Sequence, residues 1–154
     1  MKKFLFAIAS ILFSTTVSAQ TLEGKVVKVM DGDTIEVLST TPLKRTRIRL
    51  ANIDAPESSQ AFGNASKQYL SSIVAGRYVQ VKIQSHDQYG RVVGDIYQNG
   101  IYVNGQMVKE GLAWVYSKYN TNSQLIIWQR EAQNKKLGLW RDKNPMPPWE
   151  FRRK

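Results

Sequence analysis

Two stretches of alternating apolar and polar residues lie near the start of the chain and flank an Asp-Gly pair. Residues 22–30 (LEGKVVKVM) and 34–39 (TIEVLS) are rich in residues that favour strands, and the triplet Asp31-Gly32-Asp33 separates them. Asp-Gly is among the most common sequences in tight hairpin turns, because it tolerates the backbone conformation that such turns need. The pattern therefore predicts a β-hairpin with this triplet at its tip.

Three more strands are expected further along the chain. Residues 45–53 (RTRIRLANI) alternate between basic or polar and apolar side chains, which places Arg45, Arg47 and Arg49 on one face. Residues 77–85 (RYVQVKIQS) and 92–103 (VVGDIYQNGIYV) give two further strands around an Asn-Gly turn. The chain thus carries five short strand segments.

Apolar residues at helical spacing predict three helices, at 60–75, 103–110 and 123–136. Gly76 and Gly111 suit the ends of the first two helices, and Asn122 or Ser123 can cap the third. The tail, residues 144–154 (NPMPPWEFRRK), is rich in proline, and we expect it to be irregular.

Five short strands, with helix after the third and at the end, are typical of an α+β, mainly β, domain. They indicate a small closed or partly closed barrel, for which the OB-fold is the natural candidate. We therefore expect an OB-fold five-stranded barrel with three helices. Such a barrel offers a concave face to an extended nucleic acid, but a fold by itself names no activity.

The first 20 residues differ in composition from the rest of the chain. Two lysines precede an apolar run from Phe4 to Phe13, and small residues follow at positions 17–19. This arrangement is typical of a secretory signal peptide, residues 1–19, cleaved after Ala19, and the alternative is an uncleaved anchor. We therefore expect export to the periplasm or the medium. One monomeric domain is expected over residues 20–154, with a proline-rich basic tail from about residue 143.

Charge and cysteine content narrow the class of protein. The full sequence has a formal net charge of +10, and loss of the two lysines of the signal peptide leaves +8. Such an excess favours polyanionic partners, namely nucleic acid, anionic lipid or cell-wall polymer, although a solubilising surface charge would look the same. The sequence has no cysteine, so neither disulfides nor Cys-bound metal can support the fold.

Carboxylates gather beside the most basic strand, which is unexpected in so cationic a chain. Asp33 ends the hairpin turn and Asp54 follows the arginines; Pro56 disfavours helix at Ala55, whose backbone carbonyl is then available. Two carboxylates and a carbonyl are hard oxygen donors of the kind that Ca²⁺ or Mg²⁺ prefers. With a single histidine, His86, a zinc or iron site is not favoured. Taken alone, the Asp-Gly-Asp triplet is better explained as an ordinary hairpin turn.

Two arginines favour a functional site over an ordinary hairpin turn. Arg49 precedes the acidic residues, and Arg91 follows a turn at Tyr89-Gly90. A guanidinium group is a planar fork that fits phosphate oxygens, although a single arginine more often forms a surface ion pair. Two guanidinium groups and a cation can neutralise the charge that grows on a phosphate, while a spare carboxylate takes a proton from water. The combination indicates phosphodiester hydrolysis.

Four segments resemble, in order and approximate spacing, the staphylococcal nuclease (thermonuclease) family: VMDGDTIEV, RIRLANIDAPES, DQYGRVVGDIY and VKEGLAWVY. The resemblance covers the chain from about Leu22 to Trp140. It implies an OB-fold barrel with three helices and a Ca²⁺-dependent nuclease that acts on DNA and RNA and leaves 3′-phosphate ends.

The resemblance also implies a metal site. Asp33 and Asp54 would bind calcium through their carboxylates, and Ala55 through its backbone carbonyl. Asp31 would support the hairpin and the metal ligands from behind.

The resemblance assigns the substrate to other residues. Arg49 and Arg91 would hold the scissile phosphate, and Glu57 would activate a water molecule or hold it in place. Aromatic faces that stack on any base would explain a weak sequence preference. The aromatic residues expected beside the nucleotide are Tyr89, Tyr116 and Tyr119.

One spacing conflicts with a simple strand. Arg49 and Asp54 are five residues apart, so strict alternation would place them on opposite faces. For both side chains to reach one phosphate, the strand must bulge or end near Asn52, as the family's architecture implies.

Two alternatives to an enzyme remain. A non-catalytic nucleic-acid-binding OB-fold module would be expected to lack Arg49, Glu57 or Arg91, and all three are present. A basic exported protein could instead bind wall or membrane polyanions without a divalent ion. Three tryptophans, Trp114, Trp128 and Trp140, are expected to fill the core or cover its rim. Basic residues toward the C-terminus could hold the polyanion or form a solvated end: Lys135, Lys136, Arg141, Arg152, Arg153 and Lys154.

Overall fold

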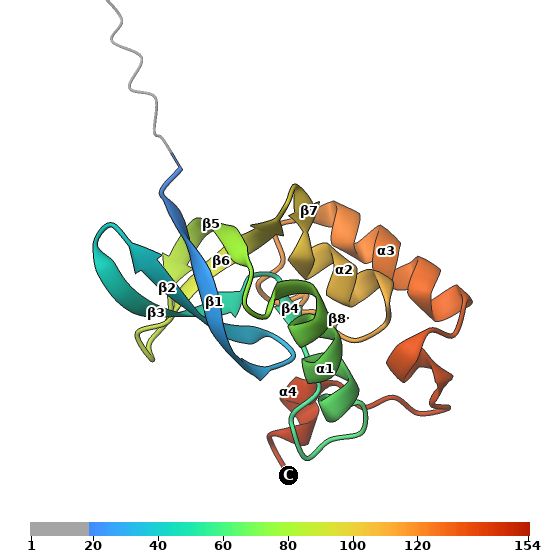
Figure 1. Cartoon of the computed structure of the whole chain (residues 1–154). Helices are drawn as coiled ribbons and strands as arrows, with labels where there is room; N and C mark the ends of the chain where they lie inside the picture. The colour runs from blue at the N-terminus through green and yellow to red at the C-terminus, as the bar shows by residue number, and fades with distance from the viewer. Residues whose placement is uncertain (1–18) are drawn as a thin grey trace, which may run out of the picture.

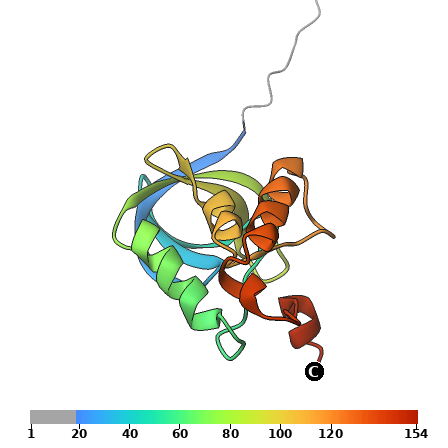
Figure 2. The same cartoon turned by 90° about the vertical axis from the view of Figure 1, so that its right-hand side faces the viewer.

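Five strands curve round a common core to form a closed barrel (Figure 1 and Figure 2). The computed structural model describes residues 19–154, so the predicted signal peptide lies outside the described residues except for Ala19. The strand order is β3-β2-β1-β5-β6, and β3 also pairs with β6 in parallel, which closes the ring. The predicted five-stranded OB-fold barrel is confirmed. Its strands are β1 (Thr21–Asp31), β2 (Thr34–Thr40), β3 (Leu43–Leu50), β5 (Tyr78–His86) and β6 (Val92–Gln98).

Branched apolar side chains fill the barrel from every strand. Alternation along each strand turns one face inward, and the inward residues are almost completely buried. At the closure, Ile48 of β3 faces Val92 of β6, and Leu50 faces Gly94. The buried residues that line the interior include Val26, Ile35, Val37, Ile48, Val81 and Ile96.

Three longer helices cover the barrel, as predicted: α1 (Gly63–Val74), α2 (Val103–Lys109) and α3 (Ser123–Asn134). The first begins three residues later than expected, and the third ends two residues earlier. Asn122 caps α3, because its side chain accepts a hydrogen bond of 3.1 Å from the backbone N–H of Gln124. Within residues 19–154, none of the helices has both the length and the apolar character that crossing a membrane requires.

Three short strands complete the fold. β7 (Ile101–Tyr102) extends the sheet beyond β6. β4 (Ile53–Asp54) pairs with β8 (Trp114–Val115) in a separate two-stranded sheet, which joins the segment after β3 to the segment after α2.

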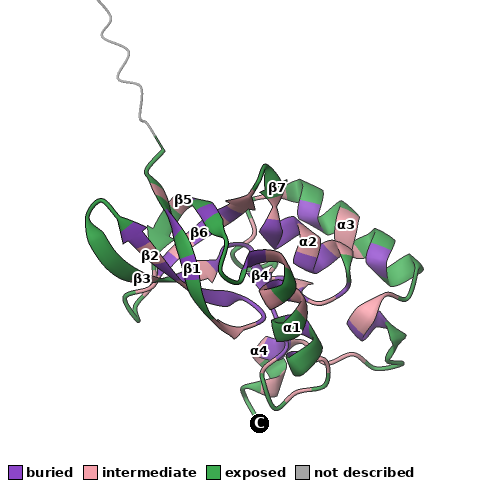
Figure 3. Ribbon diagram, in the orientation of Figure 1, coloured by how far each residue is buried: buried purple, intermediate pink, exposed green. Residues whose placement is uncertain are grey.

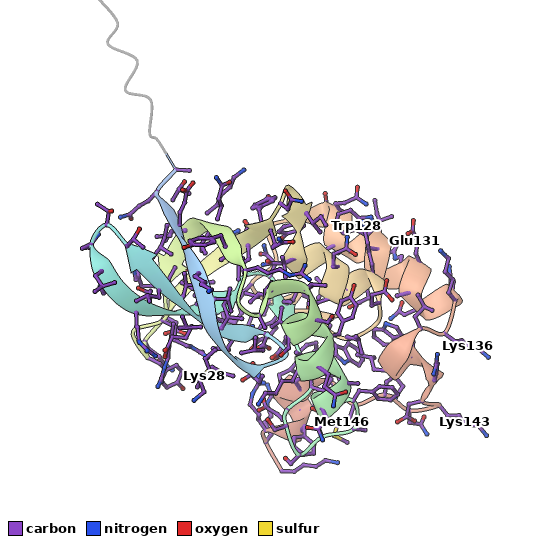
Figure 4. The ribbon with its side chains drawn as sticks, in the orientation of Figure 1. Lys28, Trp128, Glu131, Lys136, Lys143 and Met146 are labelled. Carbon is purple, nitrogen blue, oxygen red and sulfur yellow. The ribbon has the colours of Figure 1, made fainter. Side chains whose placement is uncertain are left out.

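The C-terminal tail corrects the prediction of an irregular segment. It contains a 3₁₀ turn, η1 (Gly138–Arg141), and a one-turn helix, α4 (Pro148–Phe151), which begins with proline at a position that needs no backbone donor. α4 lies beside the loop that precedes α1 (Figure 1). The side-chain amide of Gln60, in that loop, donates a hydrogen bond of 2.6 Å to the carbonyl of Met146, which is labelled in Figure 4.

Tryptophans serve the core, as predicted. Besides the main core of the barrel, a smaller apolar cluster under η1 contains Trp140, which is 9% exposed, with Trp114 packed against it. Trp128 of α3 packs on the main core. Figure 3 shows buried residues in the barrel wall and on the inner faces of the helices, whereas the outer face of α3 is exposed.

Candidate active site

The hairpin tip between β1 and β2 is fixed by its own aspartates. Asp31 Oδ1 accepts a hydrogen bond of 3.0 Å from the backbone N–H of Asp33. The Asp33 side chain points into the molecule, where Oδ2 accepts a hydrogen bond of 2.7 Å from the N–H of Ala55. The tip is therefore joined directly to the segment that follows β4.

The chain turns sharply between β3 and β4. Asn52 has a φ of 68°, a left-handed conformation that interrupts a strand. Its side-chain oxygen accepts a hydrogen bond of 3.0 Å from the N–H of Thr121, and its carbonyl accepts one of 2.8 Å from the N–H of Tyr116. This turn ends the alternation and brings Asp54 to the side of Arg49, so the predicted end of the strand near Asn52 is confirmed.

Arg49 joins the two buried aspartates. Its Nη1 lies 3.2 Å from Asp33 Oδ2, and its Nη2 lies 3.2 Å from Asp54 Oδ1. The Arg49 side chain is 15% exposed, and that of Asp54 only 1%. One guanidinium group thus neutralises carboxylates from two different segments.

A second guanidinium group, from the C-terminus, enters the same cluster. Arg152 Nη2 donates to Asp54 Oδ2 at 2.8 Å and Nη1 to Asp54 Oδ1 at 3.1 Å. Its Nη1 also donates to Glu57 Oε1 at 2.6 Å. The sequence predicted only that Arg152 would be a polyanion contact or part of a solvated end; it pairs with two carboxylates of the chain, while its side chain stays 41% exposed. Nearly 100 positions separate the partners, so local spacing carried no signal.

Asp31 and Asp54 are held where ionisation is costly. Burial raises the pKa of Asp31 to about 6, and the neighbouring charge of Asp33 adds to the effect. Burial also raises the pKa of Asp54, while hydrogen bonds and charge from Arg152 and Arg49 act against that rise. Positive charge from Arg49 and Arg152 therefore helps to keep Asp54 ionised.

The donor set fits a divalent cation. Asp33, Asp54 and Glu57 supply carboxylate oxygens that now pair with the guanidinium groups of Arg49 and Arg152. Oxygens of this kind suit Ca²⁺ or Mg²⁺. No group of three or more His, Cys, Asp or Glu residues within residues 19–154 is arranged as a ready-made metal site. Backbone oxygen or water would have to complete the ligand set, as the role predicted for the carbonyl of Ala55 requires.

Arg91 and Tyr89 lie on the loop that leads into β6. Arg91 directly precedes Val92, which pairs with β3, so it lies one strand away from Arg49. Its Nε donates to Asp87 Oδ2 at 2.7 Å, and its guanidinium lies 5.5 Å from the centre of the Tyr89 ring. Tyr89 is 74% exposed. Among the described residues, no ion pair joins Arg91 to the acidic cluster, and its phosphate-binding role stays a prediction.

Tyr116 and Tyr119 follow β8, the partner strand of the segment that carries Asp54. Their rings meet edge to face with centroids 4.9 Å apart. Trp149 of α4 stacks on Tyr116, with centroids 5.2 Å apart and planes inclined by 5°. The aromatic group is thus adjacent to the acidic cluster through the β4–β8 pair. Trp149 escaped the sequence analysis because nothing in the tail indicates what it contacts.

A closed OB barrel whose wall brings arginines and carboxylates together beside aromatic rings defines the class of a nucleic-acid phosphodiesterase. Comparison with known proteins agrees: residues 47–142 match the family described as staphylococcal nuclease homologue. The chain is 45% identical over 153 residues to an uncharacterized endonuclease of Escherichia coli, covering 99% of this chain and 98% of that protein. It is 40% identical over 158 residues to a micrococcal nuclease of Shigella flexneri, covering 96% and 90%.

The chain therefore belongs to the staphylococcal nuclease family, as the sequence motifs predicted. It is a nuclease, and nucleic acid is its substrate.

Proposed function

We propose that the protein is an exported, calcium-dependent nuclease that hydrolyses DNA and RNA with little sequence preference and leaves 3′-phosphate ends. The observation that carries the proposal is one cluster in which Arg49 pairs with Asp33 and Asp54, and Glu57 is joined to Asp54 through Arg152. The product ends and the breadth of substrate rest on the resemblance to the staphylococcal nuclease family.

The residues of the cluster divide the work of phosphodiester hydrolysis. Asp33 and Asp54, with the carbonyl of Ala55, would hold the cation, which supplies positive charge against the phosphate when it is bound. Arg49, which already points into the cluster, would donate hydrogen bonds to the phosphate oxygens. Glu57 is 37% exposed, so water can reach its carboxylate, and it would take the proton of the attacking water.

The neighbouring elements would bind the rest of the substrate. Arg91 would have to exchange its partner Asp87 for the phosphate, which is feasible because both side chains are partly exposed. Tyr89, Tyr116 and Tyr119 would stack on bases, and stacking does not distinguish one base from another. These contacts would account for a weak sequence preference.

Calcium is favoured by the kind of ligands that the cluster offers. Ca²⁺ accepts six to eight oxygen ligands in flexible geometry, so two carboxylates, a backbone carbonyl and water can serve together. Mg²⁺ demands a nearly ideal octahedron and gives up water reluctantly. Export rests on the N-terminal segment, and the charge of +8 that remains after cleavage suits a monomer that meets polyanions.

The test uses the purified chain from Gln20 onward and its Glu57→Gln variant. Each is incubated with single-stranded DNA or RNA in calcium, in magnesium and in a chelator, and the ends of the fragments are identified. Glu131→Gln is the matched control, because Glu131 projects from the exposed face of α3 (Figure 4).

We expect cleavage in calcium with 3′-phosphate ends, unchanged in Glu131→Gln and reduced on the order of 10²-fold or more in Glu57→Gln. Cleavage that persists in the chelator would refute the calcium dependence. Equal turnover in wild type and Glu57→Gln would remove Glu57 from the mechanism. Binding without cleavage in every condition would favour a polyanion-binding module.

A further inference from the structure

Arg152 is the most firmly held charged side chain of the C-terminus. Two of its nitrogens contact both oxygens of Asp54, and one of these nitrogens also contacts Glu57. The geometry is a bidentate, charge-assisted fork, the strongest form of such a contact. Because the Asp54 side chain is 1% exposed, the guanidinium closes that carboxylate off from anything else that would bind it.

Trp149 lies on the same helical turn and covers an aromatic ring beside the cluster. Its ring stacks in parallel on Tyr116 and meets Trp114 edge to face, with centroids 5.7 Å apart. A base could not stack on that face of Tyr116 while the indole stays there. Arg152 follows Trp149 by three positions, about one helical turn, so one rigid movement of α4 would free both places.

We propose that residues 148–154, here called the C-terminal arm, are an internal occupant of the active site. Arg152 holds the place of the cation between Asp54 and Glu57, while Trp149 holds the place of a base on Tyr116. The cation and the nucleic acid then compete with the arm, and Arg152 determines the apparent cation affinity. This inference rests on the proposed calcium-dependent function.

The arm is attached in a way that permits release. α4 is one turn long, and the Arg152 side chain is 41% exposed. A cavity of about 250 Å³ lies beside the arm, between Phe151 and side chains that include Phe62 and Trp114. Apolar packing around Phe151 is therefore incomplete, and less contact energy is lost when the arm leaves. The bond from Gln60 to Met146 would keep the preceding segment in place.

Competition of this kind has a measurable size. When a binding-competent state is only partly populated, the apparent dissociation constant rises by the inverse of that fraction. An arm that is docked for about nine-tenths of the time would weaken calcium binding roughly tenfold. Arg152→Gln should tighten calcium binding by that factor, because an uncharged glutamine cannot replace the guanidinium group that pairs with Asp54 and Glu57.

The first experiment measures calcium affinity by calorimetry without nucleic acid, on the chain from Gln20 onward. Arg153→Gln is the matched control, because it removes the same charge from the next, exposed residue. We expect roughly tenfold tighter binding in Arg152→Gln and less than a twofold change in Arg153→Gln. Trp149→Phe should tighten binding severalfold without altering a carboxylate contact, and it carries the test if Arg152→Gln does not fold.

The second experiment observes the arm itself. The four tryptophans give four indole N–H signals in an NMR spectrum, and the Trp149 signal is identified by its loss in Trp149→Phe. Calcium should shift the Trp149 signal of the wild type toward the position of a freely exposed indole. In Arg152→Gln the signal should be closer to that position before calcium is added.

Calcium affinity that is unchanged or weaker in both Arg152→Gln and Trp149→Phe would overturn the inference. A weaker affinity in both would instead place the arm in the working site. A Trp149 signal that calcium leaves unmoved would overturn it as well. Neither result would touch the nuclease proposal, which is judged separately by chelator-sensitive cleavage and the effect of Glu57→Gln.

Discussion

Asn104 offers the sharpest test of how the fold supports the active site. This residue of α2 is completely buried, and its side chain makes three hydrogen bonds to the backbone. Oδ1 accepts from the N–H of Ile96 at 3.0 Å, while Nδ2 donates to the carbonyls of Ala51 at 3.0 Å and Gly94 at 3.2 Å. It therefore ties α2 to β6 and to the turn that leads to Asp54.

The cost of Asn104→Ala follows from the groups left behind. The carbonyl of Gly94 still receives a hydrogen bond of 2.8 Å from the N–H of Ala51. Ile96 N–H and the Ala51 carbonyl lose the partner that the asparagine gave them, in a site without exposure. Each buried polar group left unpaired costs about 1–3 kcal/mol, so we expect the free energy of unfolding to fall by about 3–4 kcal/mol.

Urea unfolding in a chelator, followed by far-UV circular dichroism, measures that loss directly. Asn134→Ala is the control, because this asparagine lies exposed near the end of α3, and it should change stability by less than about 0.5 kcal/mol. Asn104→Asp should be no better than alanine, since a carboxylate would face two carbonyls. A loss below about 1 kcal/mol for Asn104→Ala would refute the hydrogen-bond accounting.

Other substitutions probe the cluster and its supports. In a chelator, Arg49→Ala should lower the free energy of unfolding by about 2–3 kcal/mol, because buried Asp33 loses its guanidinium partner and buried Asp54 keeps only Arg152. Saturating calcium should restore part of the loss, and an equal loss in both conditions would contradict that reason. Gly32→Ala should cost about 1–3 kcal/mol and weaken calcium binding in a titration, since the new Cβ would come within 2.6 Å of Ser66 Cβ and push the hairpin tip outward. Gly100→Ala, at a φ of 78° in open space, should lower the free energy of unfolding by about 1 kcal/mol. Gly138→Ala, at a φ of 50° against backbone carbonyls, should lower it further in thermal unfolding, and equal losses would show that crowding is irrelevant.

The two-residue and 3.6-residue periods of the sequence were enough to predict the barrel strands and the three longer helices. These elements form where local preference, alternation and end signals agree, as at the Asp-Gly turn before β2 and at the Asn122 cap of α3. Ordered motifs likewise predicted the family and most of the cluster. Asp33, Arg49 and Asp54 all lie within 22 residues of one another in the chain.

The sequence did not reveal the contacts that depend on distant segments. The left-handed turn at Asn52 is stabilised by Thr121 and Tyr116, so alternation alone would have placed Arg49 and Asp54 on opposite faces. The sequence predicted an irregular C-terminal tail and left its basic residues as a polyanion contact or a solvated end, because the partners of Arg152 lie almost 100 residues away.

The sequence by itself determined the barrel strands, the three longer helices, the family and the chemical types gathered near the hairpin, because these follow from short-range patterns and ordered motifs. Only the tertiary structure decided that Arg152 enters the acidic cluster and that Trp149 covers Tyr116. The physical reason is that a buried carboxylate pairs with the cationic side chains that the folded chain places next to it. That choice depends on where the far end of the chain packs, not on any spacing along it.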